Sequence, residues 1–223
     1  DDGYAIRTDL SGKTIRSYSI GSDITCFQEG TGGKIWIGTI SHGLVELDVL
    51  SGKKTIVPEL KGMRIEAMAR DNTGRLYLGT SGFGIMIYDP AVKTCTSLSE
   101  LDPGNYKLLR NSYINKLLID SRNRLWIGHY LGASCYDLGK ESFLDIATDS
   151  LMNTSICYAL AEKNDGSIWF GTSNGLYTWK EYEGRYDRYT TAQGLSSNMV
   201  CGLAEDNDGN IWCSTFRGLN CLD

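Results

Sequence analysis

The chain has 223 residues, a length that suits one domain or two small ones. Apolar residues make up 41% of it and charged residues 22%, which is typical of a packed globular core and not of a disordered chain. The net charge of −5 argues against a nucleic-acid partner or an anionic-membrane surface. No window approaches the roughly 18 consecutive apolar residues of a membrane-spanning helix. The first residues are no signal-peptide start, so we expect any targeting segment to lie outside this sequence.

Residues 1–20 are predicted to form half of a larger unit. The stretch 3–18 parallels residues 43–54, and both contain Leu-Ser-Gly-Lys, at 10–13 and 50–53. Each stretch begins with a glycine followed by a β-like run. We therefore assign this half-repeat the third and fourth strands of a unit whose full form follows it.

The first complete unit, 21–61, contains four predicted strands. The first strand covers 24–27, and the second covers 34–39 and contains Trp36. The turn between them, 30–33, is rich in glycine, which tolerates the positive φ of tight hairpins. A third strand follows Gly43, and a short fourth strand covers 55–57.

The same order recurs in four further units, placed at 62–110, 111–153, 154–196 and 197–223. The aromatic residue of the second strand recurs with spacings of 41, 49, 43 and 43 residues, at Trp36, Tyr77, Trp126, Trp169 and Trp212. The longest spacing reflects an extended connection at 99–112, which is either a second region for ligand contacts or a tolerated insertion. No stretch shows a sustained 3.6-residue apolar period, so we expect helix to be essentially absent.

Five such units predict an all-β fold, a β-propeller of four-stranded antiparallel blades over residues 1–223. One four-stranded sheet cannot bury both of its faces, so the blades must stack. Second strands such as 35–37 are accordingly apolar on both faces. The Trp column is expected to pack between blades. A glycine column suits close approach of neighbouring blades, and only Ser214 departs from it: Gly38, Gly79, Gly128 and Gly171.

The ends of the chain leave two interpretations of the propeller open. The last unit lacks a fourth strand, which residues 13–18 could supply by strand exchange to close a five-bladed ring. Alternatively, the chain is a piece of a longer propeller. We favour the second interpretation because the third strand of the half-repeat is superfluous in a closed ring. A cut piece exposes edge strands and apolar blade faces, which favours a homo-oligomer.

The last unit carries a motif specific enough to suggest a family. It reads Asn-x-Val, then Ala-Glu-Asp-x-Asp-Gly-Asn-Ile-Trp, then Thr, then Gly-Leu-x-x-x-Asp over 198–223. This pattern closely resembles the two-component regulator propeller repeat, and the resemblance covers nearly the whole chain. Three departures leave the fold expectation intact but indicate no specific ligand: Tyr77 for the tryptophan, His129 for the threonine and Ser214 for the glycine.

The resemblance implies a sensory role outside the cytoplasm. Such repeats build the periplasmic sensor regions of hybrid two-component systems in Bacteroides-type gut bacteria. In that family, these sensor regions sense oligosaccharides. It further implies that the remainder of a sensor kinase chain, with a membrane helix and a histidine kinase, is a partner of this segment. Kinase activity itself cannot belong to these residues. We therefore expect a non-catalytic, oligosaccharide-binding propeller without a cofactor.

Candidate ligand-binding residues lie in the loops between second and third strands. These loops vary between otherwise uniform strands, and their aromatic, amide and guanidinium groups suit a carbohydrate face. The alternative is that they are ordinary exposed loops of a scaffold whose site lies elsewhere. The candidates are His42, Phe83, His129, Tyr130, Asn174, Phe216 and Arg217.

No metal site or catalytic residue is predicted. His42 and His129 occupy equivalent loops of two units, but neither a third ligand nor a positioned carboxylate accompanies them. Residues 206–209 resemble the start of a calcium loop, yet Arg217 stands where the bidentate Glu is required, so we interpret them as a turn. Seven cysteines leave at least one free thiol, and we expect most of them to be small buried hydrophobes.

Two other function classes compete with the sensor. A propeller lyase of the streptogramin-inactivating type has similar Gly-x-Ile-Trp-Phe runs, but there Thr-Glu follows, whereas Glu never follows the threonine here. A protein-interaction scaffold like the WD-repeat propellers is less favoured, because the Trp-Asp and Gly-His pairs are missing.

Overall fold

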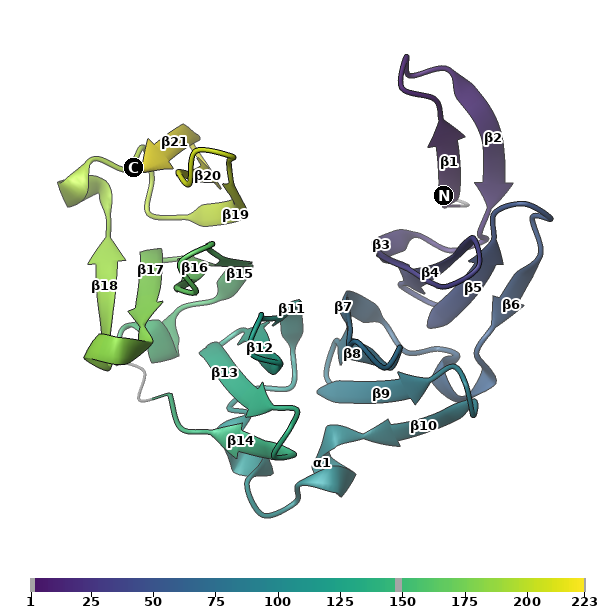
Figure 1. Cartoon of the computed structure of the whole chain (residues 1–223), viewed down its shortest axis with the longest axis horizontal. Helices are drawn as coiled ribbons and strands as arrows, with labels where there is room; N and C mark the ends of the chain where they lie inside the picture. Colours follow the sequence, from purple (N-terminus) through teal and green to yellow (C-terminus); the bar gives the residue numbers. More distant parts are fainter. Residues whose placement is uncertain (1–2, 147–149, 223) are drawn as a thin grey trace.

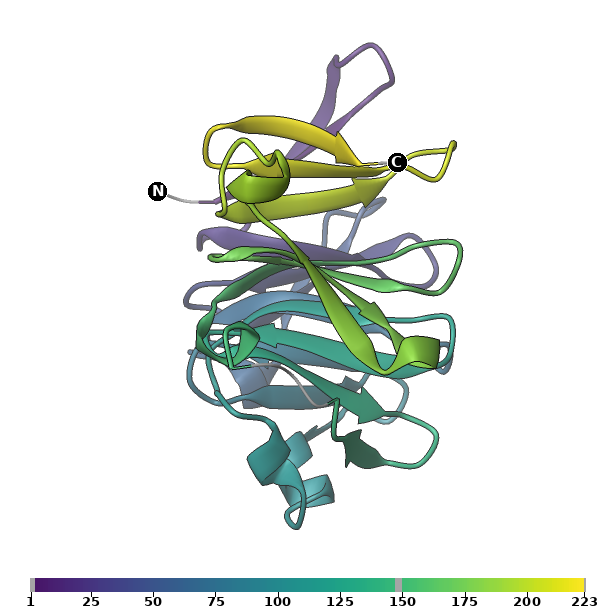
Figure 2. The same ribbon diagram turned by 90° about the vertical axis from the view of Figure 1, so that its left-hand side faces the viewer.

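The computed structural model of the chain describes residues 3–146 and 150–222. Within them, antiparallel sheets succeed one another along an open arc, seen from one side in Figure 1 and edge-on in Figure 2. Four sheets have four strands, the last has three and the first has two. The prediction of an all-β propeller built of antiparallel blades is confirmed.

In each complete blade, the first strand lies on the inner side of the arc and the fourth at the outer rim (Figure 1). The first strands are β3 (Ile24–Glu29), β7 (Ile65–Arg70), β11 (Ile114–Ile119), β15 (Cys157–Glu162) and β19 (Val200–Glu205). The second strands are β4 (Lys34–Thr39), β8 (Leu76–Thr80), β12 (Arg124–His129), β16 (Ile168–Thr172) and β20 (Ile211–Thr215). The third strands are β5 (Leu44–Asp48), β9 (Ile85–Asp89), β13 (Gly132–Asp137), β17 (Gly175–Lys180) and β21 (Gly218–Leu222). The fourth strands are β6 (Lys54–Ile56), β10 (Thr94–Ser97), β14 (Ser142–Leu144) and β18 (Arg185–Tyr189).

The half-repeat at the N-terminus forms a two-stranded sheet of β1 (Tyr4–Thr8) and β2 (Thr14–Ser19). It packs against the first blade, where Ala5 and Tyr18 share a core cluster with Ile37 and Val45. The strand exchange of the less favoured interpretation does not occur, because β2 pairs with β1 and, within the described residues, β21 pairs only with β20. The described residues therefore form an open arc and not a closed five-bladed ring (Figure 1).

Short helical turns occupy several connections, contrary to the expectation that helix is essentially absent. The turn α1 (Leu98–Leu101) begins at Ser97, whose hydroxyl accepts from the Glu100 amide while the Glu100 carboxylate accepts from the Ser97 amide. This reciprocal cap and the full burial of Leu98 stabilise one turn that is too short to show a periodicity. The 3-10 turns are η1 (Pro58–Leu60), η2 (Tyr106–Leu108), η3 (Met152–Thr154), η4 (Glu181–Glu183) and η5 (Thr191–Gln193).

The core consists of clusters between successive sheets. Trp126, for example, is fully buried and packs edge-on against Phe170 of the next blade, with ring centroids 5.6 Å apart. The predicted aromatic column packs in this way in four blades, where it is at most 9% exposed. Trp212 of the last blade is 40% exposed, because no described sheet covers that face of β20.

The glycine column lets neighbouring blades approach closely, as predicted. A Cβ at Gly79 would lie 2.6 Å from Ile114 Cγ2, and one at Gly171 would lie 2.9 Å from Val200 Cγ1. Ile114 and Val200 each begin the first strand of the following blade. The glycine is therefore required by blade stacking, since a methyl group would force the blades apart.

The seven cysteines are free thiols. Three are buried and two are half-buried, which fits the expectation of small buried hydrophobes. Two on the last blade are exposed, because no further described sheet covers the face of that blade away from the fourth. In that order they are Cys135, Cys157 and Cys213, then Cys26 and Cys95, then Cys201 and Cys221.

Candidate functional site

The loops between second and third strands share one hydrogen-bonding scheme. In the first blade, the hydroxyl of Thr39 donates to the Gly43 carbonyl at 2.9 Å and accepts from the His42 amide at 3.0 Å. Thr80, Thr172 and Thr215 form the equivalent pairs of bonds in their own blades. The threonine thus holds the loop backbone, and the variable side chains of the loop need not contribute to its shape.

His129 takes the place of this threonine in the third blade and is fully buried. Its Nδ1 accepts from the Leu131 amide at 3.2 Å, and its Nε2 lies 3.0 Å from Ser134 Oγ, which donates to the Leu108 carbonyl. Nε2 is therefore the protonated nitrogen of the neutral ring. Burial, and secondarily the charge of Arg110, lowers the pKa of His129 to about 4.

This placement corrects the prediction for His129, since a fully buried ring cannot touch a ligand. His42 lies in the first blade, two blades away from His129 in the third, and its side chain is half-buried. The structure therefore does not bring the two histidines together.

Aromatic side chains form a strip across the second and third blades. Phe83 is 60% exposed and Tyr130 is 47% exposed. Tyr113, in the connection that leads into β11, packs edge-on against Tyr130 with ring centroids 5.6 Å apart. A Cβ at Gly82, the neighbour of Phe83, would lie 3.8 Å from the ring of Tyr113. Tyr113 thus bridges two loops that belong to different blades.

Tyr158 of β15 extends this strip toward the fourth blade. Burial raises its pKa, and the neighbouring Cys201 and Tyr130 contribute to the rise. It is the extra residue of a β-bulge between Cys157 and Ala159, and bulges redirect side chains. We call Phe83, Tyr113, Tyr130 and Tyr158 the aromatic strip.

The sequence reasoning missed two members of this strip. Tyr113 lies in a connection between a fourth and a first strand, and such connections leave a blade at the same end as the candidate loops. That rule could have indicated Tyr113. No sequence signal marks Tyr158, because the bulge that redirects it becomes visible only in the strand register.

The remaining candidates lie in the fourth and fifth blades. Asn174 is held by Arg188 of β18, whose Nη2 donates to its side-chain oxygen and to its carbonyl at 2.7 Å each. Phe216 is 77% exposed, and its amide donates to the Met199 carbonyl at 3.0 Å. Arg217 is exposed beside it.

Residues 206–209 form the hairpin turn between β19 and β20, as predicted. One carboxylate oxygen of Asp206 accepts from the amides of Asp208 and Asn210, and the other accepts from the Trp212 indole at 2.8 Å. Bonds to the Trp212 indole and to Asn210 lower the pKa of Asp206 to about 2. This carboxylate therefore serves the turn, and it positions the aromatic residue of the repeat.

The described part of the chain contains neither a metal-binding cluster nor a membrane-spanning helix. Within residues 3–146 and 150–222, no group of three or more His, Cys, Asp or Glu side chains is arranged to hold a metal ion. None of the helices in the described ranges has the length and apolar character needed to cross a membrane.

Three segments of the chain match one family model. The two-component regulator propeller model matches residues 108–130, 150–174 and 194–217. Each match reaches the end of a second strand or the loop that follows it. No curated protein matches the chain.

Solved structures with the same fold include two extracellular domains of hybrid two-component systems from B. thetaiotaomicron. They are 22% and 21% identical to the chain, cover 96% and 92% of it, and have TM-scores of 0.74 and 0.75. The chain covers only 30% and 29% of those domains. Virginiamycin B lyase from Staphylococcus aureus is 11% identical, with a TM-score of 0.74, over 100% of this chain and 74% of the lyase. At these identities the likeness shows the fold alone.

Proposed function

We propose that this chain, which carries two-component regulator propeller repeats, is a ligand-binding segment of a sensor protein's periplasmic region. The ligand is an oligosaccharide, bound by the loop face that carries the aromatic strip. Binding changes the geometry of a paired sensor region and, through the rest of the chain, the activity of a histidine kinase.

The aromatic strip is the observation that carries this proposal. Its exposed rings offer flat apolar faces on which the C–H faces of sugar rings stack. Because Tyr113 joins the loops of two blades, a ligand lying across the strip contacts both blades at once. Phe216 and Arg217 add a second aromatic face and a donor on the fifth blade.

A non-catalytic role agrees with the chemistry of this face. A general base must reach its substrate, whereas His129 is buried and its pKa lies near 4. His42 lies in a different blade from His129. The fold shared with a lyase does not carry over that enzyme's chemistry, because one fold hosts many functions.

Tyr130→Ala tests the loop face directly. Calorimetric titration with a panel of plant and host oligosaccharides should identify a ligand, and the variant should bind it at least tenfold more weakly because a stacking face is lost. Tyr4→Ala is the matched control, since Tyr4 is 59% exposed on the N-terminal half-blade. The proposal fails if no glycan binds to a longer protein that includes this chain, or if both variants bind the glycan equally.

A further inference from the structure

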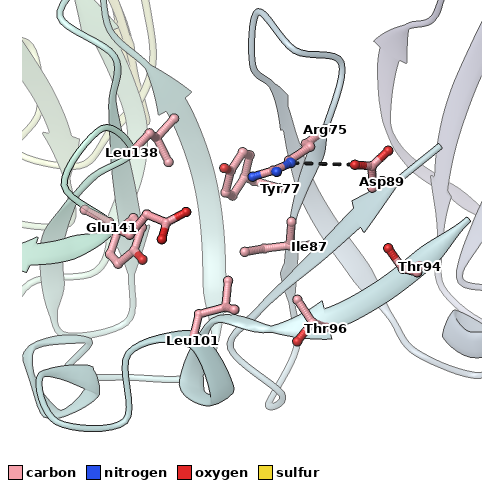
Figure 3. A pocket seen from close by; sticks show the side chains of 10 residues that line it. Arg75, Tyr77, Ile87, Asp89, Thr94, Thr96, Leu101, Leu138 and Glu141 are labelled. Carbon is pink, nitrogen blue, oxygen red and sulfur yellow. Dashed lines mark ion pairs between the residues drawn. The ribbon is translucent and has the colours of Figure 1, made fainter. Parts of the chain in front are cut away.

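A cavity of about 240 Å³ lies between the second and third blades (Figure 3). Strands β8, β9 and β10 with α1 form one wall, and β13 with the turn after it forms the other. Its charged residues lie at two kinds of turn. Arg75 lies at the turn between a first and a second strand, and Asp89 and Glu141 lie at turns between third and fourth strands. In an antiparallel blade these turns lie at the end opposite the candidate loops. The cavity is therefore separate from the aromatic strip.

One wall carries a guanidinium and a carboxylate, and the other carries a carboxylate. On the second blade, Arg75 Nε lies 3.6 Å from Asp89 Oδ2, and the Arg75 side chain is 48% exposed. This separation exceeds that of a good hydrogen bond, so the pair leaves the guanidinium capacity for further acceptors. On the third blade, Glu141 extends toward the middle of the cavity (Figure 3). Among the described residues, none forms an ion pair with Glu141.

A buried hydroxyl without a partner lies in the same wall as Glu141. Tyr136 is 2% exposed, and within the described ranges its hydroxyl has no hydrogen-bond partner. Burial, with smaller effects of Asp102 and Glu141, raises the pKa of Tyr136 to about 12, so the group keeps its proton at neutral pH. An unpaired buried hydroxyl is costly, and a ligand oxygen or nitrogen that bonds to it removes that cost.

The rest of the lining is mixed: three aliphatic side chains, Ile87, Leu101 and Leu138, lie beside the polar or aromatic Tyr77, Thr94 and Thr96. Ile87, Leu101 and Leu138 point toward the space between the two blades (Figure 3). The volume corresponds to roughly eight water molecules at liquid density. A ligand that fills it is therefore small and has an apolar part as well as charged ends.

We propose that this cavity binds a small zwitterion with an aliphatic side chain, an α-amino acid of the size of leucine. Its carboxylate lies against the guanidinium of Arg75 and its ammonium group against Glu141, with the Tyr136 hydroxyl bonded to one of these ends. A lone anion of the same size is repelled by Asp89 and Glu141, and a lone cation is repelled by Arg75. A neutral polyol leaves Ile87, Leu101 and Leu138 without an apolar partner and offers no charge to Arg75 or Glu141. This site goes beyond the proposed function, since it lies away from the loop face.

Matched ligands separate these alternatives. Calorimetry on the 223-residue chain should detect binding of L-leucine. The anion 4-methylpentanoate and the cation 3-methylbutylammonium, each with one charged end, should bind at least tenfold more weakly, as should glucose. The proposal is overturned if nothing binds, or if any of the three comparison ligands binds as tightly as leucine.

Two variants test whether the ligand lies in this cavity, and two others are controls. Glu141→Gln and Tyr136→Phe should each weaken leucine binding at least tenfold, while Glu59→Gln, which removes an exposed carboxylate that does not line the cavity, should leave it unchanged. Tyr136→Phe should keep the melting temperature or raise it, because its hydroxyl has no partner to lose. Unaltered leucine affinity in Glu141→Gln contradicts the proposal. Tyr130→Ala should leave leucine binding intact, so failure of the oligosaccharide proposal is distinguishable from failure of this one.

Discussion

At the scale of single residues, one side chain can keep a loop's shape while changing its response to pH. His129 replaces the threonine that holds the equivalent loops of the other blades, and it accepts from a loop amide as that threonine does. Unlike a threonine, it can take up a proton. Its ring is fully buried, and protonation of Nδ1 would break its bond to Leu131.

We therefore predict that His129 makes the chain less stable in acid. The folded pKa of about 4 lies below the ordinary value of about 6.5, so the unfolded chain binds more protons between these values. The free energy of unfolding should fall as the pH drops from 6.5 to 4, by up to about 3 kcal/mol from this residue.

Urea denaturation at several pH values measures this contribution. His129→Thr restores the residue of the other blades and should flatten the pH dependence between 4 and 6.5. His42→Gln is the control, because His42 is only half-buried, and it should keep the dependence of the unaltered chain. Equal slopes for the His129→Thr variant and the unaltered chain would show that the buried imidazole does not govern acid stability.

At the scale of elements, the blades are held together by close contact of their strands. The second strand of one blade lies against the start of the first strand of the next, and a glycine stands at each contact. Side-chain hydrogen bonds cross the same boundary. Asn115 Nδ2 donates to the Cys157 carbonyl at 3.1 Å, and the hydroxyl of Thr25 donates to the Ile65 carbonyl. Both donors are bulge residues of their first strands, so the bulge redirects polar groups toward the neighbouring blade.

Gly79→Ala should weaken the contact between the second and third blades. The added methyl carbon would lie 2.6 Å from Ile114 Cγ2, so the free energy of unfolding should fall by about 1–3 kcal/mol, the usual effect of overpacking. Gly104→Ala is the control, because a Cβ there meets nothing within 4 Å. Urea denaturation compares the two variants, and similar midpoints would argue against tight packing at this glycine.

At the scale of the whole molecule, the arc has two free ends (Figure 1), and exposed apolar side chains lie at each of them. At the N-terminal end, Ile6 and Phe27 are 60% and 55% exposed and line an apolar hollow of about 390 Å³. At the C-terminal end, Leu219 is 63% exposed and Trp212 is 40% exposed. Exposed apolar surface of this kind favours association between molecules.

We accordingly predict that this chain on its own self-associates in a concentration-dependent way. Sedimentation velocity should show larger species as the protein concentration rises, and Phe27→Ser combined with Leu219→Ser should shift the distribution toward the monomer. Leu10→Ser is the control, since Leu10 is fully exposed at the tip of the β1–β2 hairpin. A monomer at all concentrations, or an equal effect of the control, contradicts the prediction.

Features confined to one repeat unit could be predicted from the sequence alone. Strand order, hairpin turns such as 206–209, the aromatic column and the glycine column follow from residues within about 43 positions of one another. Their physical causes are also local, because alternation, turn chemistry and one recurrent contact between neighbours determine a blade.

Only the tertiary structure decided features that depend on residues from different units or on strand register. It buried His129, joined Tyr113 to Tyr130, directed Tyr158 through a bulge and opened a cavity between Arg75 and Glu141. It also showed that β2 pairs with β1 and not with the last blade, so the described residues form an open arc. The reason is that the repeated residues determine the strands and turns that all blades share. A site depends instead on the side chains that differ between blades, and only the stacking of two blades brings these side chains together.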